Sequence, residues 1–293
     1  MTAPHDLLRF GRDITSEHGE DGVIEKIFEV IDEENGWCVE LGALNGVHGS
    51  NVWHLIKECG WSSVLIEADQ TYFEKLEREY AGLDRAYCVN AFVSFEGENS
   101  LDNIFARTPL PRTFDLLSLD IDGNDHHLWE SLTDYHPRVM LVEFNPTIPN
   151  EVAFIQPRDM KVFQGSSLRA FVELGKRKGY ELVAANESNA FFVLKELFPK
   201  FGIADNSIDA LHTDHQYETK LFQLYDGTLR IAGYDRLLWH NLPLDVEKLQ
   251  VLSPQARRYP ARIDESGALR RLKYWVRKLP LYASLQRLRK LLK

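Results

Sequence analysis

Short apolar runs and helical patterns alternate along the first two thirds of the chain. Apolar residues recur at helical spacing in 16–31, and the pattern ends at Asn35-Gly36. Further helices are predicted at 51–58, 72–80, 125–132 and 167–178, and strands at 37–41, 63–67, 86–89, 114–120 and 139–144. Strands that alternate with helices predict an α/β fold, with a mostly parallel sheet and helices on both faces.

After residue 178 the alternation of strands and helices ends. Residues 180–184 and 190–194 are two strands joined by a short polar turn, which predicts a closing hairpin and an antiparallel last strand. Beyond residue 201 the pattern weakens, and three short strands are predicted at 222–225, 228–232 and 237–239. We therefore expect a catalytic domain over 1–197 with an N-terminal helix, a small extension over 198–263 and a basic helical tail over 264–293.

Composition narrows the class of protein. The chain has 293 residues, of which 44% are hydrophobic and 27% charged, as in ordinary globular proteins. No apolar run approaches the roughly 18 residues of a membrane span, and the N-terminus lacks the apolar core of a secretory signal. Three cysteines without a C-x-x-C pair favour a reducing compartment, so we expect a cytoplasmic protein.

Charge is distributed unevenly. The net charge is −10, yet residues 269–293 contain nine basic residues and no acidic residue. The acidic remainder argues against nucleic-acid binding. In the tail, one apolar stripe is formed by Leu281, Leu285, Leu288 and Leu292. Two interpretations stay open: peripheral binding at the cytoplasmic face of the inner membrane, or packing against the acidic body or a second protomer.

A glycine turn follows the first predicted strand. Glu40 lies near the end of that strand, and Gly42 and Gly46 give the spacing G-x-x-x-G, which is not the G-x-G-x-x-G of dinucleotide folds. Glu67 ends the next strand, where a carboxylate can accept hydrogen bonds from both ribose hydroxyls. Because ligands bind beyond the carboxyl ends of parallel strands, this pair predicts a nucleoside site. The alternative is a tight turn without a ligand.

Three segments in order resemble the motifs of S-adenosylmethionine-dependent methyltransferases, with the FkbM-type O-methyltransferases as the most similar group. The segments are 40–46 (ELGALNG), 66–69 (IEAD) and 118–123 (SLDIDG). The resemblance covers about residues 15–197 and implies a Rossmann-like methyltransferase fold, with seven strands of which the last is antiparallel. It also implies that S-adenosylmethionine is the cofactor. In this family the methionyl part would be surrounded by Glu40, Gly42 and Gly46, the ribose held by Glu67, and the adenine placed near Asn90, Ala91 and Phe92.

Acidic and amide residues gather at the ends of the fourth and fifth predicted strands. Asp120 and Asp122 should face Glu143 and Asn145, because neighbouring strand ends converge. Such oxygen ligands favour Mg²⁺ or Mn²⁺. The alternative is that Asp122 or Asn124 caps the following helix.

The resemblance adds to this metal hypothesis. Metal-using sugar and catechol O-methyltransferases carry an acid after the fourth strand and acidic or amide residues after the fifth, which Asp120 and Glu143 match. Gly123 stands where these enzymes commonly have their base, so His126 or His127 would have to accept the proton instead. An exposed helix start and a metal-ligand role are alternatives for both histidines.

These observations predict an O-methyltransferase that acts on a hydroxyl of a sugar or glycan, with Asp120, His126 and His127 as catalytic residues. A bound cation would lower the pKa of the hydroxyl, and positioning would supply much of the rate. Two other classes remain open: an oxidoreductase with a nucleotide cofactor, and a non-catalytic nucleoside-binding module.

Two further segments allow a functional and a plain interpretation. Residues 17–22 could lie over the cofactor as a lid, although a solvated helix start is favoured. His212, Asp214 and His215 could bind a metal, although a polar loop is favoured.

Overall fold

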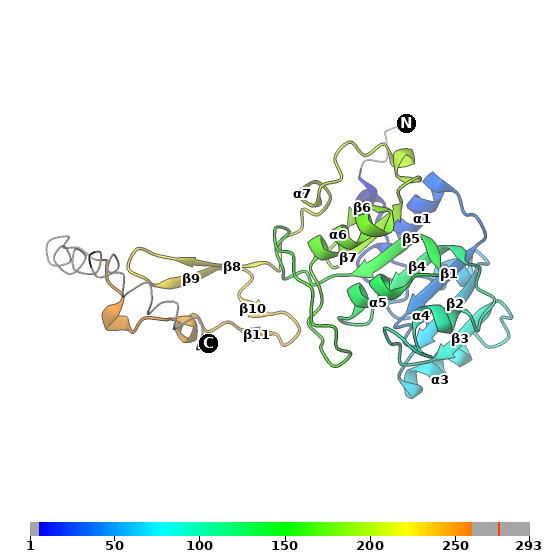
Figure 1. Ribbon diagram of the computed structural model, residues 1–293, viewed down its shortest axis with the longest axis horizontal. Coiled ribbons are helices and arrows are strands. Elements are labelled where there is room, and N and C mark those ends of the chain that lie inside the picture. Colours follow the sequence, from blue (N-terminus) through cyan, green and yellow to red (C-terminus); the bar gives the residue numbers. More distant parts are fainter. Residues whose placement is uncertain (1–5, 260–274, 276–293) are drawn as a thin grey trace. The chain divides into compact units, whose positions relative to one another are not determined.

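The structure is a computed structural model that describes residues 6–259 and Trp275. The chain divides into two units, with the boundary between Glu218 and Thr219 (Figure 1). This boundary lies later than the one expected at residue 197. The reason is that Phe201 and His212 are buried in the first unit, so the segment after the hairpin completes its core rather than starting the extension.

The first unit is built on a seven-stranded sheet with the order β3-β2-β1-β4-β5-β7-β6 (Figure 1). The strands are β1 (Trp37–Leu41), β2 (Ser62–Glu67), β3 (Ala86–Asn90), β4 (Thr113–Leu119), β5 (His136–Glu143), β6 (Tyr180–Ala185) and β7 (Asn189–Leu194). β1 to β5 pair in parallel, and β7 pairs antiparallel with both β5 and β6. This topology confirms the Rossmann-like methyltransferase fold that the sequence predicts.

Helices cover both faces of the sheet, as expected. One face packs against α1 (Glu20–Ile31), α2 (Trp53–Lys57) and α3 (Gln70–Glu79). The other packs against α4 (Leu101–Phe105), α5 (Asp125–Ser131) and α6 (Leu168–Lys178). Side chains alternate between the two cores along β5, where Met140 and Val142 face one core while Val139 and Leu141 face the other.

Short helical elements complete the first unit. They are η1 (Leu7–Phe10), η2 (Phe198–Phe201) and α7 (Ile208–Leu211). The sequence pattern did not predict α4, which is five residues long. α1 begins at Glu20 rather than at residue 16, because Gly19 ends the preceding loop in a left-handed conformation (φ 88°).

A buried ion pair fixes the end of the sheet opposite the carboxyl ends of its parallel strands. Asp115 of β4 is fully buried and accepts hydrogen bonds from the backbone N–H groups of Glu34, Asn35 and Gly36. Arg138 of β5 donates to the same carboxylate. The α1–β1 loop is therefore held to the centre of the sheet by a carboxylate whose charge is fully compensated.

The second unit contains two small antiparallel ribbons. β8 (Thr219–Gln223) pairs with β9 (Leu229–Gly233), and β10 (Arg236–Leu237) pairs with β11 (Leu242–Pro243). Two 3-10 turns follow, η3 (Val246–Leu249) and η4 (Pro254–Ala256). The predicted strands at 222–225 and 228–232 correspond to β8 and β9, with the first strand starting three residues earlier than expected.

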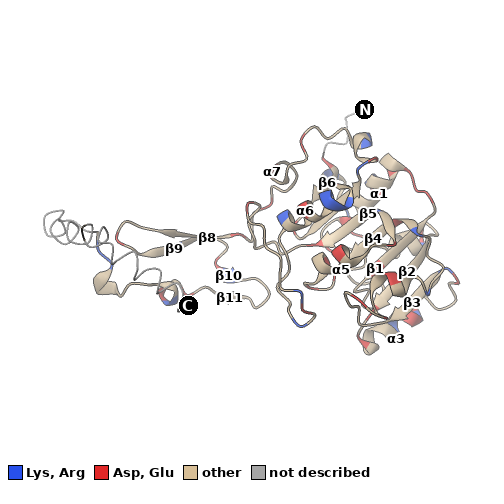
Figure 2. Cartoon of the chain, viewed as in Figure 1, with Lys and Arg blue, Asp and Glu red and all other residues tan. Residues whose placement is uncertain are grey.

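Basic and acidic residues are both distributed over the helices and loops of the first unit (Figure 2). Lys176, Arg177 and Lys178 occupy the last turn of α6, where they complement the helix dipole. The predicted leucine stripe of the tail lies outside the described residues. Within residues 6–259 and at Trp275, no helix has the length and apolar composition needed to cross a membrane.

Candidate functional site

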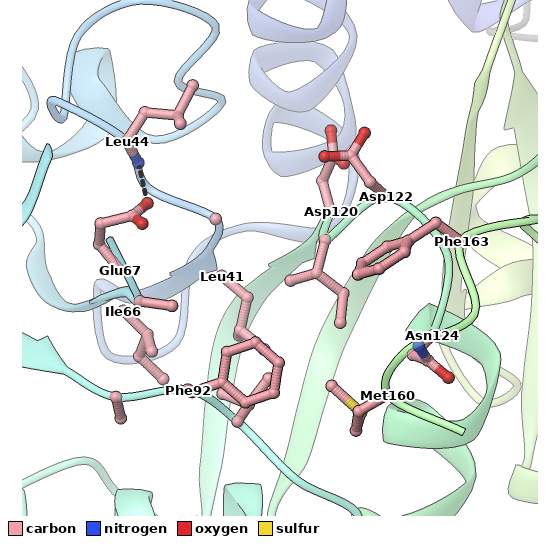
Figure 3. A pocket seen from close by; sticks show the side chains of 15 residues that line it. Leu41, Leu44, Ile66, Glu67, Phe92, Asp120, Asp122, Asn124, Met160 and Phe163 are labelled. Carbon is pink, nitrogen blue, oxygen red and sulfur yellow. Dashed lines mark hydrogen bonds between the residues drawn. The ribbon is translucent and has the colours of Figure 1, made fainter. Parts of the chain in front are cut away.

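A cavity of about 260 Å³ opens at the carboxyl ends of β1, β2, β3 and β4 (Figure 3). We call it the first cavity. Its wall is mostly apolar with three carboxylates, and the lining residues are Leu41, Gly42, Leu44, Ile66, Glu67, Ala68, Ala91, Phe92, Val93, Asp120, Ile121, Asp122, Asn124, Met160 and Phe163. This is the position that the parallel sheet and the glycine turn predict.

The two glycines of the turn after β1 have different roles. Gly42 lines the first cavity in a left-handed conformation (φ 73°), and a Cβ there would lie 2.1 Å from the carbonyl oxygen of Asp120. Gly46 is also left-handed (φ 76°), but a Cβ there would meet Leu76 and Tyr80 of the α3 region. Gly46 therefore allows the turn to pack on α3 and does not line the cavity, contrary to its expected place around a cofactor.

Glu40 lies beneath the turn rather than in the first cavity. It is buried, and its two carboxylate oxygens accept hydrogen bonds from the Ser50 hydroxyl (2.8 Å) and the Asn51 backbone N–H (2.7 Å). Burial raises the pKa of Glu40 to about 8, because the charged form loses its hydration. In this structure Glu40 shapes the loop that leads into α2.

Glu67 occupies the place expected for it, at the end of β2 and on the cavity wall. Its oxygens accept hydrogen bonds from the backbone N–H groups of Leu44 (2.8 Å; Figure 3) and Asp69 (2.6 Å). These bonds fix the carboxylate while each oxygen keeps a second lone pair for a ligand hydroxyl. The side-chain amide of Asn90 instead donates to the Glu67 carbonyl (2.9 Å), so Asn90 ties β3 to β2 and does not line the cavity.

Aromatic side chains stand at the mouth of the first cavity. Ala91 and Phe92, which follow β3, line it as expected. Phe92 is 58% exposed and Phe163 is 66% exposed, which is unusual for phenylalanine. Sequence reasoning missed Phe163 and Met160, which come from the connection between β5 and α6. That connection contains several other apolar residues, so its composition does not single these two out.

Asn124 and Asp125 hold this part of the wall together. Asn124 donates to the carbonyl oxygens of Asp159 (3.2 Å) and Val162 (3.1 Å), which fixes the loop that carries Phe163. Asp125 accepts hydrogen bonds from the backbone N–H groups of Ile121 (2.9 Å) and Gly123 (2.9 Å). The turn before α5 is therefore closed by Asp125, and neither Asp122 nor Asn124 caps the helix with its side chain.

The predicted acidic cluster forms. Oxygens of Asp120, Asp122 and Glu143 lie within 4.8 Å of one another, and the carboxylates of Asp120 and Asp122 lie side by side in Figure 3. Asp122 has a left-handed backbone (φ 59°), which is costly for a residue other than glycine. Burial raises the pKa of Asp120 to about 6, and burial together with Asp120 raises that of Glu143.

Asn145 does not join this cluster. Its side-chain nitrogen donates to the Gln164 carbonyl (2.7 Å), and its side-chain oxygen accepts from the backbone N–H (2.9 Å) and hydroxyl (2.7 Å) of Thr147. Both ends of the amide are therefore used to shape the loop after β5.

His126 and His127 lie in the core and do not line the first cavity. Their exposed fractions are 1% and 8%, so the interpretation as an exposed helix start is wrong. His126 packs against Phe171 of α6, and burial lowers its pKa to about 4. His127 donates through Nε2 to the Gln156 carbonyl (2.8 Å). Possible ligand atoms of His126, His127 and Glu130 lie within 4.8 Å of one another, so these three side chains could hold a metal ion. They do not lie beside Asp120 in a cavity, where a base would be needed.

A second, smaller cavity of about 90 Å³ shares only Asp120 with the first. We call it the second cavity. It is almost wholly polar, and its lining residues are Glu17, His18, Glu20, Gly49, Asn51, Asp120, Glu143, Ser188 and Asn189. The N-terminal segment therefore contributes to the site. The favoured interpretation of residues 17–22 as a solvated helix start is wrong, because Glu20 and Asp21 are buried.

The histidines after η2 have structural contacts. His212 is buried, and its Nδ1 lies 2.7 Å from the side-chain oxygen of Asn150. His215 pairs with Glu218 (2.7 Å). Across the described ranges, neither histidine belongs to a group of side chains that could hold a metal ion.

Comparisons with known proteins give structural neighbours only. No protein-family model matches the chain, and no curated protein matches its sequence. Among solved structures, the chain is similar to a putative O-methyltransferase from Klebsiella pneumoniae, with 16% identity and a TM-score of 0.42 over 64% of this chain and 87% of that one.

Two further neighbours are also methyltransferases or carry their ligand. A SAM-dependent methyltransferase from Aquifex aeolicus has 14% identity and a TM-score of 0.36 over 58% of this chain and 87% of that one. The N-terminal domain of EvdMO1 with SAH bound has 11% identity and a TM-score of 0.40 over 61% and 81%.

Proposed function

We propose that this chain is an S-adenosylmethionine-dependent O-methyltransferase that acts on a hydroxyl of a sugar or glycan with the help of a divalent cation. The observation that carries the proposal is the position of Asp120, which lines both cavities. The first cavity has the apolar and aromatic wall of a nucleoside site. The second has the carboxylates of a site for hydroxyls or cations. A methyl donor in the first would meet an oxygen acceptor beside Asp120.

The chain supplies a separate contact for each part of the cofactor. Glu67 is fixed by two backbone N–H groups and can accept hydrogen bonds from the ribose hydroxyls. Phe92 and Ala91 provide the apolar surface for adenine. Gly42 lets the backbone of β1 approach that of β4, so the methionyl part would pass between the two strand ends. An adenosyl group would cover the two exposed phenylalanine rings at the mouth.

The acidic cluster fits a hard divalent cation such as Mg²⁺ or Mn²⁺. Three carboxylates within 4.8 Å of one another repel unless protons or a cation lie between them, and oxygen ligands are those that these ions prefer. Asp120, Asp122 and Glu143 would hold the ion. Such an ion supplies charge that lowers the pKa of a hydroxyl.

The second cavity favours a hydroxylated acceptor. Most of its lining side chains are hydrogen-bond acceptors, and none is Lys or Arg. Sugar hydroxyls donate to such groups, whereas an anionic acceptor would be repelled. The carboxyl groups of Asp120 and Glu143 are in hydrogen-bond contact and provide the nearest place for the proton that the acceptor loses.

The proposal is tested first by binding. Isothermal titration calorimetry of the full chain with S-adenosylmethionine, S-adenosylhomocysteine and NAD⁺, each with and without Mg²⁺ or Mn²⁺, should give saturable binding for the first two only. Binding of NAD⁺ alone would instead favour the oxidoreductase class. Binding of both adenosyl ligands without turnover on any acceptor would favour a nucleoside-binding module.

Activity is the second test. Transfer of labelled methyl groups to a panel of sugars and glycans should give a product with the wild-type chain. Asp120→Ala should abolish transfer while leaving the affinity for S-adenosylmethionine within a few-fold. Full turnover of Asp120→Ala in chelator-treated protein would refute the metal-assisted mechanism.

A further inference from the structure

Asn189, a residue of the second cavity's wall, has a side-chain oxygen without a hydrogen-bond donor. Asn189 begins β7, lines this cavity and is 7% exposed. Its Oδ1 is buried and accepts no hydrogen bond from any residue that the structure describes. A buried oxygen without a partner is unfavourable, because it loses water and gains nothing in exchange. This atom is therefore suited to a ligand that the chain itself does not contain.

Glu20 determines which end of this amide is left free. The side-chain nitrogens of Asn189 (3.0 Å) and Asn186 (2.6 Å) both donate to Oε1 of Glu20. The other oxygen of Glu20 accepts from the backbone N–H of His18 (2.8 Å), which keeps the carboxylate in place. Because the amide nitrogen of Asn189 is the end that donates to Glu20, Oδ1 is the end that faces away from Glu20.

The neighbours of Asn189 in the second cavity are also acceptors. Strand pairing places Asn189 directly opposite Glu143, and the Glu143 carboxyl group contacts that of Asp120. Side chains that end or follow β4, β5 and β7, namely Asp120, Glu143 and Asn189, therefore line one small space. No lysine or arginine lines that space to balance their charge.

We propose that Asn189 is a ligand of the divalent cation, together with Asp120 and Glu143, and that Glu20 is the residue that positions its amide. The inference rests on the proposed function, because it concerns the same ion. It assigns to β7 the neutral oxygen ligand that the sequence pattern assigned to Asn145. A volume of about 90 Å³ accommodates the ion with about two water molecules, each of which takes roughly 30 Å³ in the liquid. With Asp122, which completes the acidic cluster, four protein oxygens and two waters give the six ligands that Mg²⁺ takes.

The direct test needs no variant. Crystals of the full chain soaked in MnCl₂ should show an anomalous peak within about 2.5 Å of Oδ1 of Asn189 and of oxygens from Asp120 and Glu143. A peak held only by carboxylates with Asn189 uncoordinated, or no peak at saturating Mn²⁺, would overturn the inference.

Affinity for Mn²⁺ gives the second test. Free Mn²⁺ is followed by electron paramagnetic resonance, without S-adenosylmethionine and without turnover. Asn189→Ala should weaken binding at least tenfold, and Glu20→Gln should weaken it about tenfold by releasing the amide, as is usual for groups that orient metal ligands. Asn145→Ala is the matched control and should bind within twofold of wild type. Wild-type affinity in Asn189→Ala, or an equal loss in Asn145→Ala, would contradict the inference.

Calorimetry with S-adenosylmethionine in the absence of metal separates the two proposals. Both Asn189→Ala and Glu20→Gln should keep wild-type affinity for the cofactor, because neither residue lines the first cavity. This readout also shows that each variant is folded. Asn189-dependent Mn²⁺ binding without cofactor binding would retain the metal site and refute the methyltransferase. Cofactor binding without Mn²⁺ binding would refute the metal site and leave the cofactor site of the proposed methyltransferase standing.

Discussion

Replacement of Gly42 by alanine tests whether the close approach of β1 to β4 builds the first cavity. A Cβ at this position lies 2.1 Å from the Asp120 carbonyl oxygen, whereas ordinary van der Waals contact begins at 3.4 Å. The obstacle is backbone, so the strand ends must separate by more than an ångström. We expect Gly42→Ala to displace Asp120 and to widen the junction of the two cavities.

The size of the effect follows from two terms. A left-handed conformation costs a non-glycine residue about 1–2 kcal/mol, and forcing atoms into a packed site costs about 1–3 kcal/mol more. Gly42→Ala should therefore lower the free energy of unfolding by about 2–5 kcal/mol. Gly82→Ala is the matched control, because Gly82 has a similar φ of 81° and no atom lies within 4 Å of its Cβ. Gly82→Ala should lose only the about 1–2 kcal/mol that the left-handed conformation costs.

Urea unfolding followed by tryptophan fluorescence measures both variants. The gain that alanine brings by restricting the unfolded chain is common to the two and cancels in their difference. Calorimetry should show S-adenosylmethionine binding at least tenfold weaker in Gly42→Ala and unchanged in Gly82→Ala. Equal losses of stability, or unchanged affinity in Gly42→Ala, would show that the approach of the two strand ends does not shape the cavity.

Three further variants test separate parts of the structure. Phe163→Ala should weaken S-adenosylmethionine binding about three- to tenfold by calorimetry, since an aromatic contact is worth about 0.5–1.5 kcal/mol, while its thermal midpoint stays unchanged because the ring is exposed; an unchanged affinity would remove Phe163 from the site. Asp115→Ala should lower the free energy of unfolding by about 3–5 kcal/mol because it removes the buried partner of Arg138 and leaves it only the exposed carboxylate of Glu34. Asp115→Ala with Arg138→Met should lose less; a larger loss in the double variant would contradict this. The pKa of His126 is about 4 in the folded chain and near 6.5 in the unfolded chain, so unfolding between these pH values takes up a proton, and the contribution of His126 to stability is lost as pH falls from about 6.5 to 4. His126→Leu should flatten the pH dependence of the free energy of unfolding, measured with urea, in this window. An unchanged slope would contradict the burial argument.

The fold follows from the sequence because its signals are local. Each buried strand is a run of apolar residues such as 63–67, and the helices between them keep a period that one or two turns suffice to reveal. The five-residue α4 was not predicted, although α2 of the same length was. The segment 198–218 was misplaced because burial of Phe201 and His212 depends on tertiary packing that no local pattern records.

The candidate site was predictable only in part. Glu67 and Asp120 directly end or follow parallel strands, so the topology alone brings them to the same edge of the sheet. His126 was misjudged because the sequence gives its separation from Asp122 in the chain but not which face of α5 packs on α6. Glu40 was assigned to the ligand because spacing does not tell whether a carboxylate at a strand end faces the cavity or the loop beneath it.

The order of the strands explains why two cavities meet at Asp120. The chain runs outward from β1 through β2 to β3 and returns to β4 on the other side of β1, so the connections leaving β1 and β4 diverge. A crevice must open between the two strand ends, and Gly42 and the Asp120 carbonyl are in contact at its floor. The first cavity extends from this point toward β3, on the side of the sheet where the glycine turn lies.

On the other side, β7 runs antiparallel beside β5 and places Asn189 opposite Glu143. Asp120, which directly follows β4, lines both cavities, and its side chain is a carboxylate. We therefore expect substitutions on the β7 side to alter metal and acceptor binding without altering cofactor binding, and substitutions on the β2 side to do the opposite.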